Sequence, residues 1–207
     1  MRKILAVKLI LGFVIIFTTT VIILLLTKTI APIDNLPSPD YRIKGNKNAK
    51  IMIIEYTDLN CPACANMNNY LNDLIKYFPN DFQVHFKHYP LERIHPYSLK
   101  AAVWVECAGV EENKFFELAD IFFKNQKEWW NNKDYINLFE KYTKEANIDV
   151  KKIKDCFNSS KTLESVKKDI ERGDKLGIDS TPTFFVNGQM AVGGMELIEI
   201  LKKEKSK

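Results

Sequence analysis

The sequence contains few residues of the kinds that bind metal ions. Four cysteines and three histidines are spread over 207 residues, and only Cys61 and Cys64 have a spacing that resembles half of a zinc site. The others are single residues without a shared ligand spacing: Cys107, Cys156, His85, His88 and His95. A structural zinc site normally has a second pair of ligands with its own short spacing. The sequence therefore disfavours structural zinc, and we expect no metal cofactor.

The body of the chain also lacks net charge. Four bases in the first 30 residues, Arg2, Lys3, Lys8 and Lys28, account for the whole formal charge of +4, and that segment has no acidic residue. A domain that binds nucleic acid carries a basic excess on its binding surface, so we expect no nucleic-acid partner. The contents of 12% aromatic and 27% charged residues are typical of a globular body.

Only one long hydrophobic run is present, the 18 uncharged residues from Leu9 to Leu26. Its length is near the lower limit for crossing a bilayer and exceeds the apolar core of a usual signal peptide. Because three bases precede it, the positive-inside rule leaves the amino end in the cytoplasm. We expect residues 1–30 to form a membrane anchor with one transmembrane helix in the cytoplasmic membrane, and the body to face the periplasm or another exported compartment. The alternative is a signal segment cleaved near Thr29-Ile30-Ala31.

The rest of the chain divides into a linker and one domain. Residues 31–43 contain three prolines and predict a stiff spacer. In the domain, 44–207, alternating apolar residues predict strands over 48–56, 82–89, 183–186 and 190–192. Helical spacing predicts helices over 62–78 and 195–203, and four or five more in a segment of about 95–176. The pattern indicates an α/β domain interrupted by an all-helical subdomain.

The most informative motif is the box Cys61-Pro62-Ala63-Cys64, which follows an apolar strand and opens a helix. Pro62 suits the first helical turn, where its missing N–H has no partner to lose. The Cys61 sulfur then lies at a helix N-terminus, which favours the thiolate over the thiol. Cys64, one turn later, lies within reach to resolve a mixed disulfide. The motif indicates dithiol–disulfide exchange.

With three other segments, this box resembles the DsbA-like thiol:disulfide oxidoreductases of the thioredoxin superfamily, in the branch with a helical insertion. The four matching segments are IIEYTDLNCPAC (53–64), VHFKHYPL (84–91), HPYSLKAAVWVECA (95–108) and STPTFFVNG (180–188). The resemblance implies a thioredoxin-like fold with an inserted all-helical subdomain, and a redox-active disulfide in place of a cofactor. The best-known members have histidine at the position of Ala63, where it can stabilise the thiolate, so this chain lacks one source of oxidising power.

The resemblance gives a role to Thr181-Pro182. By pattern alone Pro182 is a turn proline between a glycine-containing turn and a strand. The resemblance implies a cis-proline loop facing the active cysteines, with the Thr181 side chain near the Cys61 sulfur. We therefore expect Pro62, Ala63, Thr181 and Pro182 to contact an extended substrate.

Two further assignments come from the resemblance. It matches Glu55 and Lys87 to a charged pair beneath the active-site disulfide, where Glu55 would take and return the proton of Cys64; from the residues alone, both are solvated charges at strand ends. It also pairs Cys107 with Cys156 in a structural disulfide, whereas free cysteines equally make small core residues.

The expected function is a membrane-anchored enzyme that introduces disulfides into exported proteins through Cys61 and Cys64. Its partners would be reduced or unfolded exported proteins and a membrane reoxidase resembling DsbB, and it would act as a monomer. One alternative is a reductase or isomerase that uses the same residues in reverse. The other is a metal-binding module or metallochaperone that holds copper or zinc through the two cysteines.

Overall fold

The computed structural model describes residues 12–21 and 33–205, which belong to two units, Met1–Pro32 and Ile33–Lys207. In the first unit, residues 12–21 form a helix with exposed apolar side chains such as Phe13 and Phe17. No helix among the described residues is long and apolar enough to cross a membrane. The expected spanning run, 9–26, extends beyond the described residues at both ends, and the possible cleavage site at 29–31 lies outside them, so both stay predictions.

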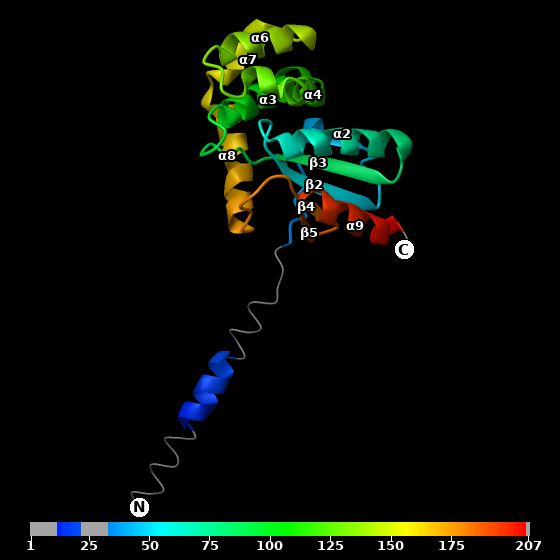
Figure 1. The fold of residues 1–207 in the computed structure, drawn as a ribbon, viewed down its shortest axis with the longest axis vertical. Helices are drawn as coiled ribbons and strands as arrows, with labels where there is room; N and C mark the ends of the chain where they lie inside the picture. The colour runs from blue at the N-terminus through cyan, green and yellow to red at the C-terminus, as the bar shows by residue number, and fades with distance from the viewer. Residues whose placement is uncertain (1–11, 22–32, 206–207) are drawn as a thin grey trace, which may run out of the picture. The chain divides into compact units, whose positions relative to one another are not determined.

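The second unit is built on a five-stranded mixed sheet with the order β1-β3-β2-β4-β5 (Figure 1). The strands are β1 (Ile43–Gly45), β2 (Ile51–Thr57), β3 (Phe82–His88), β4 (Thr183–Val186) and β5 (Gln189–Val192). Strands β2 and β3 run parallel, and every other neighbouring pair is antiparallel. Because β2 is the central strand, the cysteine box that follows it is placed at the middle of one sheet edge.

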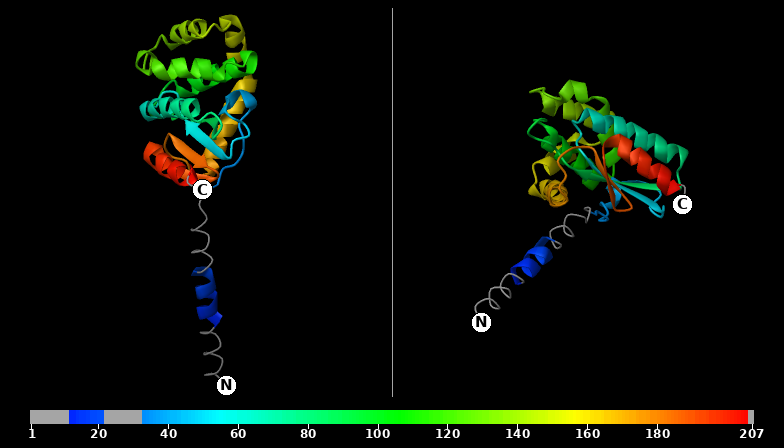
Figure 2. Two further views of the ribbon diagram at one scale, coloured as in Figure 1. Left: turned by 90° about the vertical axis from the view of Figure 1, so that its right-hand side faces the viewer. Right: turned by 60° about the horizontal axis from the view of Figure 1, so that its bottom comes forward.

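Two helices cover one face of the sheet. Helices α2 (Pro62–Tyr77) and α9 (Gly193–Lys205) lie side by side on this face (Figure 2). Their apolar residues recur at helical spacing and pack on inward-facing side chains of β2, β3 and β4. The residues in this core include Ile53, Met67, Leu71, Phe82, Val84, Phe184, Leu197 and Leu201. The opposite face carries a second core, which includes Ile54, Tyr56, Tyr89, Leu176, Ile178 and Phe185.

The helical insertion lies between β3 and β4, as expected. Its helices are α3 (Ser98–Glu112), α4 (Phe115–Lys124), α5 (Gln126–Trp129), α6 (Tyr135–Glu145), α7 (Val150–Phe157) and α8 (Ser160–Lys175). Helix α8 runs from this helical layer to the sheet (Figure 1). Large side chains fill the insertion, among them Trp104, Phe122, Trp129, Phe139 and Tyr142, each no more than 1% exposed. Their burial removes apolar area from water and so helps to hold the insertion together.

The hairpin between β4 and β5 turns at Asn187-Gly188. Both residues have positive φ angles, 47° and 89°. A two-residue turn of this kind needs left-handed backbone at both positions, which asparagine and glycine adopt most readily. The turn fixes the register in which Phe184 is paired with Ala191. Strand β5 then leads directly into α9, which packs on the same face of the sheet as α2.

From residue 33 onward the expected spacer is not separate from the body, which corrects this part of the prediction for 31–43; residues 31 and 32 lie outside the described residues. Asp34, Ser38 and Arg42 are all buried. Asp34 accepts a hydrogen bond of 2.6 Å from the Tyr56 hydroxyl, and the Ser38 hydroxyl donates one of 2.7 Å to the carbonyl of Phe86. Residues Asp40–Arg42 form a short 3-10 helix, and the Asp34 and Ser38 side chains attach the segment to β2 and β3.

A buried ionic cluster joins the amino-terminal segment, the sheet and the insertion. The Arg42 guanidinium forms ion pairs with Glu106 on α3 and with Asp169 on α8. The Nε2 atom of His88 lies 3.3 Å from the Oε2 atom of Glu106. Burial alone would raise the pKa of Glu106, but the hydrogen bond with His88 and the charge of Arg42 bring it down to about 2. The carboxylate is therefore ionised at every physiological pH, and the cluster holds three parts of the chain together.

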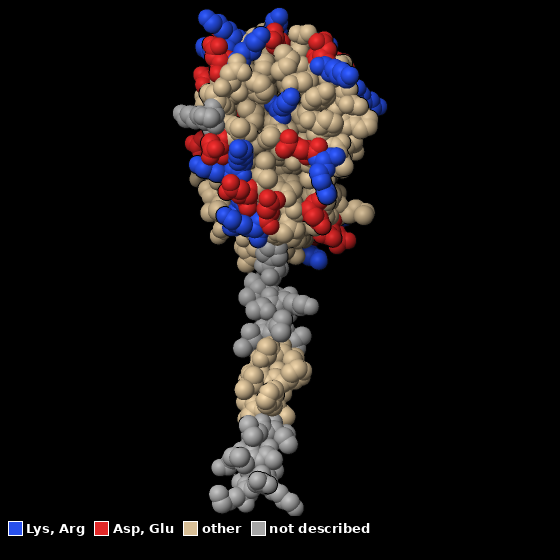
Figure 3. Space-filling view, turned by 90° about the vertical axis from the view of Figure 1, so that its left-hand side faces the viewer, with Lys and Arg blue, Asp and Glu red and all other residues tan. Residues whose placement is uncertain are grey.

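Charges of both signs are interspersed over the face of the body shown in Figure 3. Lys154 and Glu140, 2.7 Å apart, form one of the pairs near the surface of the body. Pairs of this kind contribute little to stability because water screens them.

Candidate active site

The cysteine box is held at the amino end of α2. Cys61 precedes the first helical residue, Pro62 occupies the first helical position, and Cys64 lies one turn along the helix. The structure contains Cys61 and Cys64 as free thiols, with Cys64 fully buried and Cys61 7% exposed. Pro62 and Ala63 are exposed between them. A partner molecule can thus reach the box from one side, at Cys61, while Cys64 faces the interior.

The pKa values of the two thiols are shifted in opposite directions. Interaction with the Cys64 thiol, and then with the backbone of Cys64 and the nearby Thr181 side chain, lowers the pKa of Cys61 to about 6, against the effect of burial. Burial, and then the hydrogen bond and negative charge of Cys61, raise the pKa of Cys64 well above its usual value. At neutral pH the Cys61 sulfur is a thiolate and the more deeply buried Cys64 sulfur keeps its proton. This division suits Cys61 to nucleophilic attack and to leaving.

The Thr181–Pro182 peptide bond is cis and lies beside Cys61. The Cys61 Sγ is 3.4 Å from the Thr181 carbonyl oxygen, and the Pro182 carbonyl accepts a hydrogen bond of 2.9 Å from the N–H of Gly193. The loop is therefore anchored at α9 on one side and meets the reactive sulfur on the other. The Thr181 Oγ1 is buried, with no hydrogen-bond partner among the described residues.

Glu55 is buried under the box, 2% exposed, and points to the same face of the sheet as Ile53 and Phe86. Burial raises the pKa of its carboxyl to about 7, while the nearby Lys44 ammonium limits the rise and a negative charge on Cys61 adds to it. A carboxyl that titrates near neutrality can both accept and return a proton.

The cation beneath the box is Lys44, a residue that the sequence reasoning missed. It comes from β1, and its Nζ donates to the Oδ1 atoms of Asn68, at 3.1 Å, and Asn72, at 2.6 Å. Both amides in turn donate to Asp120 on α4, at 2.7 and 3.3 Å. This chain of hydrogen bonds links α2, β1 and the insertion, and it fixes the ammonium near Glu55.

Lys87 is not part of this group, which corrects the expected Glu55–Lys87 pair. In the parallel pairing of β2 with β3, Glu55 is opposite Phe86 and Lys87 is opposite Tyr56. Paired residues share a face and successive residues alternate, so Lys87 points to the other side of the sheet. There its Nζ lies 3.6 Å from Asp169 of the ionic cluster.

The loop between β2 and the box is fixed by buried polar contacts. Asp58 accepts hydrogen bonds from the N–H of Asn60 and of Leu91, both 2.8 Å, and from His95 at 2.7 Å. The Gln126 side chain donates to the carbonyls of Leu59 and Cys61, at 2.8 and 2.9 Å. The insertion therefore holds the backbone that presents the reactive sulfur.

The sequence contains two pairs of adjacent aromatic residues, Phe122-Phe123 and Trp129-Trp130, and three of these four side chains are core residues. Phe122 and Trp129 are fully buried and Phe123 is 5% exposed, but Trp130 is 54% exposed. The Trp130 carbonyl accepts a hydrogen bond of 3.3 Å from Asn60, so this tryptophan lies next to the loop that leads into the box.

Cys107 and Cys156 form a disulfide within the insertion. The S–S distance is 2.14 Å, and the bond joins α3 to α7 across 49 residues of sequence. Both sulfurs are buried and remote in sequence from the box.

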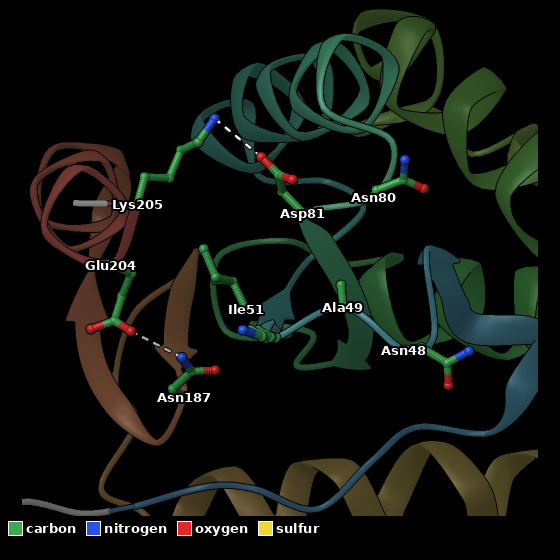
Figure 4. A pocket seen from close by; sticks show the side chains of 9 residues that line it. Asn48, Ala49, Ile51, Asn80, Asp81, Asn187, Glu204 and Lys205 are labelled. Carbon is green, nitrogen blue, oxygen red and sulfur yellow. Dashed lines mark hydrogen bonds and ion pairs between the residues drawn. The ribbon is translucent and has the colours of Figure 1, made fainter. Parts of the chain in front are cut away.

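A cavity of about 620 Å³ opens at the other end of the sheet, where β2 begins (Figure 4). Its sides are closed by an ion pair of 3.3 Å between Lys205 and Asp81, and by a hydrogen bond of 3.0 Å from Asn187 to Glu204. Since the box follows the carboxyl end of β2, this cavity takes no part in the cysteine site.

The central strand leads into a CxxC box at the N-terminus of a helix, and the box faces a cis-proline loop. This arrangement defines a thioredoxin-like redox site. A family model described as Thioredoxin matches residues 38–201, and the chain belongs to this family. The fold is that of the DsbA-like branch, as the following structures show.

Two solved structures illustrate the likeness. Oxidised BdbD from Bacillus subtilis superposes with a TM-score of 0.73 at 21% identity, over 86% of this chain and 100% of that one. Alpha-DsbA1 from Wolbachia pipientis superposes with a TM-score of 0.69 at 24% identity, over 83% of this chain and 92% of that one. At these identities the structures establish the shared fold.

Curated relatives are much longer proteins. A segment of "Na(+)/H(+) antiporter NhaA 1" from Mycobacterium sp. (strain KMS) is 30% identical over 175 residues, which are 84% of this chain and 27% of the relative. The chain thus spans about a quarter of the curated relatives it matches.

Proposed function

We propose that this protein is a thiol:disulfide oxidoreductase that introduces disulfides into exported proteins through Cys61 and Cys64. The observation that carries the proposal is the opposite acidity of the two thiols across one helical turn. A pKa of about 6 for Cys61 lies between about 7 for thioredoxin and about 3.5 for DsbA. A stabilised thiolate favours the reduced protein, and hence favours passing the disulfide to a client.

In the proposed reaction a client thiolate attacks Cys61 of the Cys61–Cys64 disulfide. The S–S bond breaks, its electron pair leaves on Cys64, and Cys64 takes up a proton. A second client thiolate then attacks the client sulfur of the mixed disulfide, so that the client becomes a disulfide and Cys61 leaves as a thiolate. The client loses two electrons and the protein gains them, so a membrane reoxidase resembling DsbB, or another electron acceptor, must restore the starting disulfide.

The geometry supports this use of the box in three ways. Pro62 and Ala63 are exposed, so an extended client can approach Cys61. The cis-proline loop offers backbone next to the sulfur. Glu55, buried and with a pKa raised to about 7 by burial, is suited to exchange a proton with Cys64. The membrane anchor, the exported location and the monomeric state belong to the same proposal and rest on the sequence.

The reduction potential of the Cys61–Cys64 pair tests the direction of electron flow. We expect equilibration of the purified full-length chain with glutathione to give a value between about −270 mV, as in thioredoxin, and about −120 mV, as in DsbA. A value at or below the thioredoxin end would favour the reductase alternative.

Trapping tests the exchange chemistry itself. The Cys64→Ala variant should accumulate mixed disulfides with exported proteins, because it cannot resolve them, whereas Cys61→Ala should accumulate none. Loss of a bound copper or zinc ion in both variants, with no trapped client in either, would support the metallochaperone alternative instead.

A further inference from the structure

The side chain of Gln126 connects the helical insertion to the backbone of the cysteine box. It belongs to α5 and is buried, at 9% exposure. Its Nε2 atom donates two hydrogen bonds, to the Leu59 carbonyl at 2.8 Å and to the Cys61 carbonyl at 2.9 Å. Carbonyl oxygens only accept hydrogen bonds, so the amide nitrogen faces them and both of its protons are used. The insertion thus reaches the residue that carries the reactive sulfur.

A third hydrogen bond runs in the opposite direction between the same two segments. Asn60 lies between the two accepting residues and is buried, and its Nδ2 donates to the Trp130 carbonyl at 3.3 Å. Trp130 is the residue that ends α5. Three consecutive residues of the loop are therefore bonded to one short segment of the insertion. The loop cannot turn relative to α5 without breaking at least one of these bonds.

The Cys61 carbonyl lies where this loop becomes helix α2. Cys61 is the N-cap of the helix, with a ψ angle of 121°, and its carbonyl also accepts the N–H of Ala65 at 3.1 Å. Rotation about ψ moves the carbonyl, and the helix that follows it, relative to the side chain on the same Cα atom. A contact that holds this carbonyl therefore also holds the amino end of α2 in place against the Cys61 sulfur.

The position of the amino end of α2 matters because its N–H groups favour a negative charge. After the Cys64 thiol, the backbone of Cys64 and of Ala63 contributes to the lowered pKa of Cys61. The Cys61 carbonyl oxygen has the opposite effect, since its partial negative charge lies in the same residue as the thiolate. The donors of Gln126 and Ala65 offset that partial charge. The Gln126 amide therefore assists the thiolate without carrying a charge of its own.

We propose that Gln126 is a positioning residue for the reactive cysteine: its amide holds the Leu59 and Cys61 carbonyls so that the amino end of α2 is aimed at the Cys61 sulfur. This inference rests on the proposed exchange function, which needs a stabilised Cys61 thiolate. Gln126 acts through the backbone of the box. The helical insertion then contributes to the reactivity of the sulfur, and it supplies from α5 part of the stabilisation that Ala63 cannot give.

Gln126→Met tests the proposal, because methionine keeps the length of the side chain and cannot donate a hydrogen bond. The rate of alkylation of Cys61 by iodoacetamide is measured against pH on the reduced full-length chain, with the labelled residue identified by mass spectrometry. We expect the midpoint of this profile to rise by about one pH unit in Q126M, which is the tenfold effect typical of a hydrogen bond. A midpoint equal to that of the wild type would overturn the proposal.

Thr143→Val is the matched control within the insertion. Thr143 is fully buried, accepts a hydrogen bond of 2.9 Å from the Trp104 Nε1 and donates one of 2.7 Å to the Phe139 carbonyl. T143V should lower the free energy of unfolding and leave the midpoint unchanged. An equal rise in T143V and Q126M would show that any loosening of the insertion has this effect, and would overturn the proposal. The ionisable residues around Cys61 are the same in both variants: Glu55, Asp58, Cys64 and His95.

The test separates this inference from the wider function, because alkylation requires no client and no exchange. A wild-type chain that exchanges no disulfide with glutathione would overturn the exchange function, whereas a raised midpoint in Q126M alone would still support the positioning role. In a chain that does exchange, a less stable thiolate disfavours the reduced protein. We then expect the equilibrium constant for oxidation of glutathione by Q126M at pH 7 to fall about fivefold, for a pKa that rises by one unit from about 6. An unchanged constant would contradict the proposal.

Discussion

The Oδ2 atom of Asp58 accepts a hydrogen bond of 2.7 Å from the Nδ1 of His95. The two residues are 37 positions apart in the sequence. Asp58 lies three residues before Cys61, and its carbonyl accepts the Cys61 N–H at 3.0 Å. This single carboxylate therefore joins the loop before α3 to the loop that presents the reactive sulfur. The contact also raises the pKa of His95 above its ordinary value, through the hydrogen bond with Asp58 and despite partial burial.

Loss of this contact should destabilise the protein more in acid than in base. The folded state holds the His95 proton more tightly than the unfolded state does. The resulting stability is fully present below the unfolded pKa of about 6.5, and it is lost as the pH rises through the higher folded pKa. We expect Asp58→Asn to lower the free energy of unfolding by roughly 1 kcal/mol more at pH 5.5 than at pH 9, the extra strength of a charged hydrogen bond.

Urea denaturation at the two pH values measures this difference. His95→Gln provides the control, because it should remove most of the pH-dependent part and leave the bonds from Asn60 and Leu91 to Asp58 in place. An equal loss at both pH values would show that His95 is neutral in its contact with Asp58.

Substitution of Lys44 should shift the pH dependence of disulfide resolution. Burial raises the pKa of Glu55 to about 7, and the Lys44 charge limits that rise. Without the ammonium, in Lys44→Met, the pKa of Glu55 should rise further, and the midpoint of the resolution rate should move to higher pH. Lys87→Met is the matched control, because Lys87 lies on the opposite face of the sheet. A shift in K87M and none in K44M would restore the pair expected from the sequence.

The ionic cluster should be sensitive to the loss of its cation. Arg42→Met would leave Glu106 and Asp169 buried without the guanidinium that pairs them. Breaking a buried pair by removing one partner typically costs about 3–5 kcal/mol. Lys154→Ala, which breaks the exposed pair with Glu140, should cost less than about 1 kcal/mol. Equal effects of the two variants on the free energy of unfolding would contradict the structural role of the cluster.

The disulfide of the insertion should stabilise the fold without taking part in exchange. Cys107 and Cys156 close a loop of 49 residues, which corresponds to about 4 kcal/mol on the chain-entropy model. We expect the double variant Cys107→Ala/Cys156→Ala to lose about that free energy of unfolding, while the reduction potential of the Cys61–Cys64 pair stays unchanged. A changed potential would mean that the insertion disulfide exchanges with the active pair.

Much of this architecture can be predicted from the sequence because it depends on local patterns. The alternation in 82–88, the proline after Cys61 and the Asn187-Gly188 turn each specify their own structure. Which lysine lies near Glu55 beneath the box depends instead on the register of the strands. The alternation of Phe82, Val84 and Phe86 already indicated that Lys87 points away from them, but β1 has only three residues and shows no period.

The amino-terminal segment could not be predicted for a similar reason. Three prolines indicate an extended chain but not whether that chain is free. Its attachment depends on contacts of the Asp34 carboxylate with the Tyr56 hydroxyl, at 2.6 Å, and with the Arg172 guanidinium, at 3.2 Å. Contacts between residues so distant in sequence leave no local pattern.

That attachment also determines how the domain would respond to tension. A pull on the chain at Ile33 would be resisted by Arg172 of α8, which donates to the Ile33 carbonyl and to the Asp34 carboxylate, and by Tyr56 of β2, which also donates to Asp34. Tyr56 lies between Glu55 and Thr57 on the central strand, which is hydrogen-bonded on both sides. The load would therefore enter the fold at two places, the central strand β2 and the last helix of the insertion, α8. A tether ending at residue 33 would thus grip the same strand that leads into the cysteine box.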